Sequence, residues 1–153
     1  MSASIAVLVV VSLPGIAVAK GPLAAIEFSG PGFEQTLSVT EGDALLDFNP
    51  WGQEFLGERL EAEPEVTDGL IVTMYLEDAS GDRRAVYRFA YYPHLAGGRI
   101  HLPGPGEADY DLNKTTILSA NDGRWLEASP GWDAFYESIV RIQPPSTGSG
   151  GLR

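Results

Sequence analysis

The chain has 153 residues, no cysteine, and a formal net charge of −11, from 10 Lys and Arg against 21 Asp and Glu. The lack of cysteine excludes disulfides, thiol catalysis, iron–sulfur clusters and cysteine-ligated zinc. The acidic balance repels phosphate backbones and anionic lipids, so we expect no nucleic-acid partner. Cationic ligands, calcium and basic protein surfaces remain compatible with this charge, although acidity is also an ordinary solubility device.

The first 19 residues have the layout of a secretory signal peptide. An apolar run over residues 5–13 is too short to span a bilayer, and it is followed by a Pro-Gly break and an Ala-Val-Ala cleavage site ending at Ala19. The first four residues lack the Lys or Arg that such signals normally carry, so an uncleaved anchor or a buried strand is the alternative. We expect a secreted or extracytoplasmic protein, with no transmembrane span in the mature chain.

The first half of the mature chain predicts short elements. Residues 23–28 form a strand that ends in a Gly/Pro turn, and residues 36–39 form its hairpin partner. Thr40 followed by acidic residues indicates a capped short helix that ends near Phe48. Residues 53–68 are rich in Glu, contain Pro64 and show little periodicity, so we expect an irregular, solvated loop.

A long antiparallel hairpin is the strongest prediction. Residues 70–76 and 85–92 are β-rich runs on either side of a loop with turn residues. A period of two places Tyr87, Phe89 and Tyr91 on one face of the second strand, and Val86, Arg88, Ala90 and Tyr92 on the other. Further strands are expected over residues 99–102 and 124–127, each after a glycine-containing turn.

The C-terminal part predicts an amphipathic helix over residues 130–141. Ser129 is the expected cap, Pro130 takes the first helical position, and apolar residues recur at Trp132, Phe135, Tyr136, Ile139 and Val140. Residues 143–153 form a Pro/Gly/Ser tail that we expect to be disordered. The whole indicates one α+β domain over residues 20–142, with an antiparallel sheet of about four to six strands and the helix packed on one face.

Three oxygen-bearing side chains at alternate positions, Asp109, Asp111 and Asn113, are the candidate calcium ligands. On a strand or loop they would face one side, as a hard cation requires. The match to a calcium loop is partial, because Lys114 stands where the EF-hand glycine belongs and Ala120 where the bidentate Glu belongs. The alternative is a polar loop or strand face.

No catalytic signature is found. His94 and His101 lie outside any H-x-x-H pattern, and the chain has no G-x-S-x-G elbow. Carboxylate pairs such as Glu61 with Glu63 would do acid/base chemistry only if one member were desolvated. We therefore predict no catalytic residue and no cofactor, with calcium as the weak exception.

The aromatic residues could stack on sugars or bind extended peptides, or they could build the core. We place the candidate binding surface in the turn-rich region from Tyr91 to Tyr110 together with Trp51, because loops commonly carry function. The candidate ligand-binding residues are Trp51, Tyr91, Tyr92, His101 and Tyr110.

Several turn motifs resemble those of small exported proteins of actinobacteria and related bacteria. The resemblance covers most of the mature chain and implies no activity and no catalytic residue. It rests on Lys20-Gly21-Pro22, Ser29-Gly30-Pro31-Gly32, Tyr91-Tyr92-Pro93, Ala96-Gly97-Gly98, Leu102-Pro103-Gly104-Pro105-Gly106 and Gly123-Arg124-Trp125.

The first hypothesis for function is a binding or interaction module of the bacterial cell envelope without chemistry of its own. Its partner would be an unknown envelope or extracellular protein or a small ligand. One alternative is an envelope hydrolase that uses carboxylates or His101. Another is a calcium-stabilised structural protein, in which residues 109–113 converge with the acidic loop 61–65.

Overall fold

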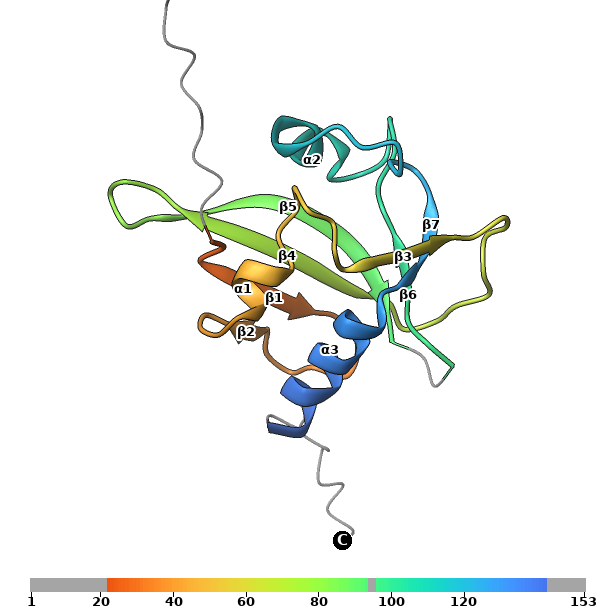
Figure 1. The fold of residues 1–153 in the computed structure, drawn as a ribbon, viewed down its shortest axis with the longest axis horizontal. Coiled ribbons are helices and arrows are strands. Elements are labelled where there is room, and N and C mark those ends of the chain that lie inside the picture. The colour runs from red at the N-terminus through yellow and green to blue at the C-terminus, as the bar shows by residue number, and fades with distance from the viewer. Residues whose placement is uncertain (1–21, 94–95, 143–153) are drawn as a thin grey trace, which may run out of the picture.

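A computed structural model describes residues 22–93 and 96–142 (Figure 1). The predicted signal peptide, His94 and the tail 143–153 lie outside these ranges. In chain order the elements are β1 (Ala25–Ser29), β2 (Leu37–Val39), α1 (Ala44–Asp47), β3 (Leu56–Arg59), β4 (Leu70–Glu77), β5 (Arg83–Tyr92), β6 (Arg99–His101), α2 (Tyr110–Thr116), β7 (Trp125–Ala128) and α3 (Pro130–Ile142).

The fold is α+β, as predicted, and its strands form one open antiparallel sheet in the order β2-β1-β4-β5-β6-β7-β3. The sheet has seven strands rather than the predicted four to six. The additional strand is β3, which arises inside the segment 53–68 that we expected to be an irregular loop. Phe55, immediately before β3, is fully buried and stacks on Phe89 with ring centroids 4.8 Å apart. This anchor brings β3 beside β7.

The predicted hairpin is confirmed as β4 and β5, which pair from Leu70↔Tyr91 to Glu77↔Arg83 with a register shift near Met74. The predicted alternation is also confirmed, because Tyr87, Phe89 and Tyr91 are at most 2% exposed and belong to the hydrophobic core. On the other face, Arg88, Ala90 and Tyr92 are half-buried, whereas Val86 is 4% exposed and belongs to the core cluster.

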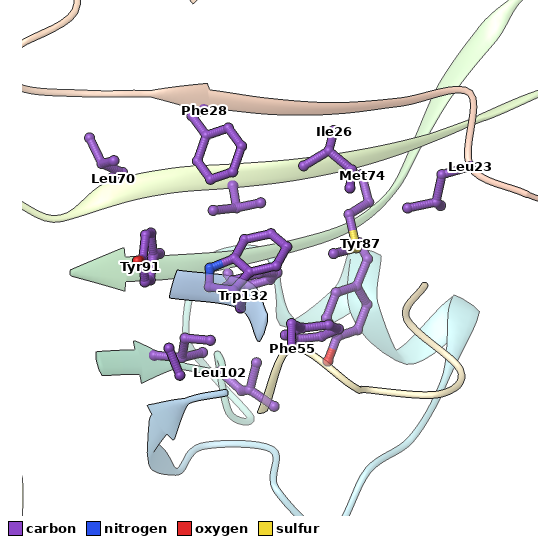
Figure 2. Packing of buried hydrophobic residues seen from close by; sticks show 14 of the residues in the cluster. Leu23, Ile26, Phe28, Phe55, Leu70, Met74, Tyr87, Tyr91, Leu102 and Trp132 are labelled. Carbon is purple, nitrogen blue, oxygen red and sulfur yellow. The ribbon is translucent and has the colours of Figure 1, made fainter. Parts of the chain in front are cut away.

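The C-terminal helix α3 contributes the largest core residue. Its predicted cap is confirmed, since the Trp132 backbone N–H donates to Ser129 Oγ at 3.2 Å. Trp132 is fully buried, and Figure 2 shows its indole in the middle of the apolar cluster. The indole contacts six rings at centroid distances of 5.2 to 5.9 Å, those of Phe28, Phe48, Phe55, Phe89, Tyr91 and Phe135.

The two short helices differ from the prediction. The cap of α1 is Asp43, without a side-chain hydrogen bond, rather than Thr40. Helix α2 forms where residues 109–113 were expected to be a strand or loop. Strand β6 pairs only with Ala90 to Tyr92, so the rest of that edge of β5 is free of a neighbouring strand. Helix α2 covers this free part. Figure 1 shows α2 and α3 on opposite sides of the β4–β5 hairpin.

The Asn113 side chain fixes α2 to β5. Its amide oxygen accepts the Arg88 backbone N–H and its amide nitrogen donates to the Arg88 carbonyl, both at 2.7 Å. Asn113 thus replaces the missing neighbouring strand at this residue. Within the described ranges, no helix has the length and apolar character needed to cross a membrane.

Candidate functional site

The candidate site lies on the face of the sheet opposite the core. The strand registers place four residues side by side in one row across β4, β5, β6 and β7, namely Ile71, Ala90, His101 and Trp125. Ala90 is between Phe89 and Tyr91 in sequence, so its side chain points to the face opposite those two core residues. Because Ala90 is the smallest member, the row has a hollow at its middle.

Three rings on this face form what we call the aromatic strip, made of Tyr92, Trp125 and His101. The Trp125 ring lies 5.3 Å from that of Tyr92 and 4.8 Å from that of His101, tilted by 40° and 34°. All three side chains are half-buried, and none belongs to the hydrophobic core. Each ring therefore keeps part of its surface accessible to solvent or to a ligand.

The backbone before β4 positions the Tyr92 ring. Gly69 lies directly beneath it, and a Cβ at Gly69 would overlap the Tyr92 ring atoms. Asp68 has a left-handed backbone with a φ of 57°, which non-glycine residues rarely adopt. The Asp68-Gly69 pair thus allows the Tyr92 ring to approach the backbone closely at this end of the sheet.

A cleft of about 820 Å³ opens at this end of the aromatic strip. Aromatic and apolar side chains form part of its wall, and the segment 63–68 forms the other part. The lining residues include Tyr92, Trp125, Tyr136, Leu70 and three prolines, together with the carboxylates of Glu63, Glu65 and Asp68. We call this the acidic cleft.

A smaller hollow of about 220 Å³ lies over Ala90, between Ile71 and the loop before α2. A hydrogen-bonded pair and an ion pair line it. His101 Nε2 lies 3.0 and 3.3 Å from the two Glu107 carboxylate oxygens, and the Arg88 guanidinium donates to Asp109 at 2.7 Å. The Gly104 backbone N–H and, to a smaller extent, His101 hold the pKa of Glu107 below its ordinary value.

The His101 ring has no nitrogen free for catalysis. Nε2 faces Glu107, and Nδ1 is buried without a hydrogen-bond partner among the residues described. A general base must reach the proton that it removes, directly or through one water. His101 thus packs in the aromatic strip, and a proton transfer through Nε2 would first have to break its contact with Glu107.

The structure brings together Tyr92 and His101 of the predicted binding residues and separates the other three. Tyr91 is 1% exposed on the core face, and its hydroxyl donates to Asp133 at 2.8 Å. Burial and that hydrogen bond raise the pKa of Tyr91. Trp51 follows α1 and shares no ring contact with the strip. The Tyr110 ring lies at the start of α2, under the Lys114 ammonium at 5.8 Å.

The candidate calcium ligands are each engaged elsewhere. Asp109 pairs with Arg88, Asp111 pairs with Lys114 at 2.6 Å, and Asn113 is buried against the β5 backbone. The acidic loops do not meet either, because Glu63 and Glu65 line the acidic cleft whereas Asp109 lines the smaller hollow. In the described part of the chain, no group of three His, Cys, Asp or Glu side chains could hold a metal ion.

Sequence reasoning did not place Trp125 or Glu107 among the binding residues, and it considered the acidic residues 61–65 only as a calcium partner or an acid/base pair. The alternation along residues 124–127 carries the signal for Trp125, since it places this ring on the face opposite Leu126. The other residues have no local signal, because their positions depend on where long loops return to the sheet. No protein-family model, no curated protein and no solved structure matches the chain.

Proposed function

We propose that the protein is an exported binding or interaction module of the bacterial cell envelope, with no chemistry of its own. The observation that carries the proposal is the aromatic strip, in which Tyr92 and Trp125 line an open cleft instead of the core. Half-exposed rings beside a concave surface provide large, rigid contact area for a ligand. The signal-like layout of residues 1–19 supports export.

The hydrolase alternative has one observation in its favour, the contact between His101 and Glu107 in the smaller hollow. The same contact weakens it, since it occupies Nε2 while Nδ1 is buried. Binding by the aromatic strip does not require a free His101 nitrogen, because aromatic rings contact a ligand through their carbon surfaces. We therefore favour binding over catalysis.

The test is thermal unfolding of the protein with calcium, EDTA, cell-wall glycan fragments, short peptides and polyamines. A ligand that binds only the folded state at ~100 times its dissociation constant adds about 2.7 kcal/mol to the free energy of unfolding. We expect one class to raise the unfolding temperature, and Tyr92→Leu and Trp125→Leu to remove that rise. Trp51→Leu is the matched control, because Trp51 does not line the acidic cleft.

Two results would overturn the proposal. One is the absence of a shift with every compound. The other is a shift that both strip variants retain in full, because the ligand would then bind away from the aromatic strip.

A further inference from the structure

The acidic residues of the acidic cleft form no ion pair within the described residues. These residues are Glu63, Glu65 and Asp68. No Lys or Arg is among the lining residues. Arg99 lies on β6 opposite Tyr92, but its guanidinium donates to the Gly97 and Gly98 carbonyls at 3.1 Å.

The same cleft offers aromatic faces beside the carboxylates. Tyr92, Trp125 and Tyr136 line it. A ring face attracts an ammonium or guanidinium group, and tryptophan does so most strongly. Carboxylates and ring faces in one concave surface are thus complementary to a cation, in a protein whose net charge is −11.

We infer that the acidic cleft docks a basic, extended peptide segment of a partner protein. This inference rests on the proposed function and names the ligand class of that site. An extended peptide presents alternate side chains on one side, roughly 6.6 Å apart, so several Lys or Arg residues can reach carboxylates and rings together. The cleft volume of about 820 Å³ is far larger than a single ammonium group needs.

The experiment is isothermal titration of the protein with three probes. These are a decapeptide of alternating Lys and Ala, a decapeptide of alternating Glu and Ala, and spermine as a free polycation. We expect the basic peptide to bind at least tenfold more tightly than spermine, and the acidic peptide not to bind. The affinity for the basic peptide should fall when NaCl is raised from about 50 mM to about 300 mM, because salt screens exposed charges.

Charge-removing variants locate the binding. Glu63→Gln with Glu65→Gln should weaken the basic peptide about threefold to tenfold, the usual effect of losing two exposed ion pairs. The matched control is Glu41→Gln with Glu77→Gln, which removes the same charge at exposed positions outside this cleft. The control should change the affinity less than twofold.

Each contrary result has its own meaning. Equal weakening by both double variants, or spermine binding as tightly as the basic peptide, overturns the peptide-docking inference. A second contrary result has two parts: the basic peptide does not bind, and a glycan raises the unfolding temperature by an amount that Tyr92→Leu removes. That result overturns the inference but leaves the proposed function standing. Failure of every compound to bind overturns both.

Discussion

At the scale of single residues, Gly69 positions the ring of Tyr92 by having no side chain. An added Cβ would overlap that ring, so Gly69→Ala must displace the ring or the chain beneath it. We expect a loss of about 1–3 kcal/mol in the free energy of unfolding, as overpacking typically costs, and a weaker ligand-induced shift. Urea denaturation measures the first effect and thermal unfolding with ligand the second.

Gly52→Ala is the control for this variant, because a Cβ at Gly52 would meet its nearest neighbours at ordinary contact distance, 3.5 Å or more. Gly69→Ala protein with wild-type stability and wild-type ligand response would show that the Tyr92 ring does not depend on Gly69.

Asn113 is a second residue whose effect can be isolated. Its amide satisfies both backbone groups of Arg88 from a side chain that is 1% exposed. Asn113→Ala leaves these groups unpaired, so we expect a loss of about 1–3 kcal/mol in urea denaturation. Lys114→Ala, which breaks only the exposed pair with Asp111, should change stability by at most about 1 kcal/mol. Equal effects of the two variants would contradict this role of Asn113.

Glu107 links stability to pH. The folded state lowers the pKa of Glu107, mainly through the Gly104 N–H, so its ionised form is stabilised relative to the unfolded chain. That contribution is present above the unfolded pKa and is lost as pH falls through the folded pKa. Wild type should therefore exceed Glu107→Gln in stability at neutral pH, by no more than about 1 kcal/mol.

The difference between wild type and Glu107→Gln should be smaller at about pH 3, below the ordinary pKa of a glutamate, than at neutral pH. Urea denaturation of both proteins at the two pH values checks this. If the difference in the free energy of unfolding between the two proteins stays constant with pH, the folded state does not stabilise the charge of Glu107.

Local alternation predicts which face of a strand a residue lies on, but not which residues of other strands it contacts. Alternation along β5 put Tyr91 and Tyr92 on opposite faces but did not show which face is the core, so both were predicted as binding residues. It could not pair Tyr92 with Gly69, because that contact depends on the register of β4 against β5.

At the scale of elements, two sequence predictions differ from the structure for physical reasons. The segment 53–68 is polar and contains Pro64, so its periodicity predicts no strand, yet burial of Phe55 in the core brings β3 to β7. Residues 109–113 alternate like a strand, yet the Asn113 amide and the free edge of β5 favour a helix there. In both cases tertiary contacts override a weak local preference.

Helix α3 shows the opposite case, because its cap, its start and its apolar stripe all follow from local sequence. Trp132→Ala should cost about 3–5 kcal/mol in the free energy of unfolding, since it removes a fully buried indole with six ring neighbours. Ile142→Ala at the same helix, 78% exposed, should stay within about 0.5 kcal/mol. Comparable losses would mean that α3 is not anchored through Trp132.

At the scale of the whole molecule, the sheet divides two roles between its faces. One face carries the core and α3, and the other carries the aromatic strip and the smaller hollow, while the acidic cleft lies at the end of the sheet, where Leu70 and Tyr136 also line it. Local patterns predicted six of the strands and the helix, whereas the strand order depends on pairings between distant segments such as β3 with β7. The acidic cleft follows from that order, because it joins residues from Pro31 to Tyr136.

The most direct test of this division of roles is the amide NMR spectrum of the protein, recorded with each compound of the thermal unfolding series and with the basic decapeptide. We expect at least one compound to shift signals from residues 63–69, 90–92, 99–101 and 125, while those of β2 and α2 stay in place. A compound that binds but shifts only β2, α2 or the segment after α1 would contradict the assignment of the aromatic strip and the acidic cleft as the binding surface.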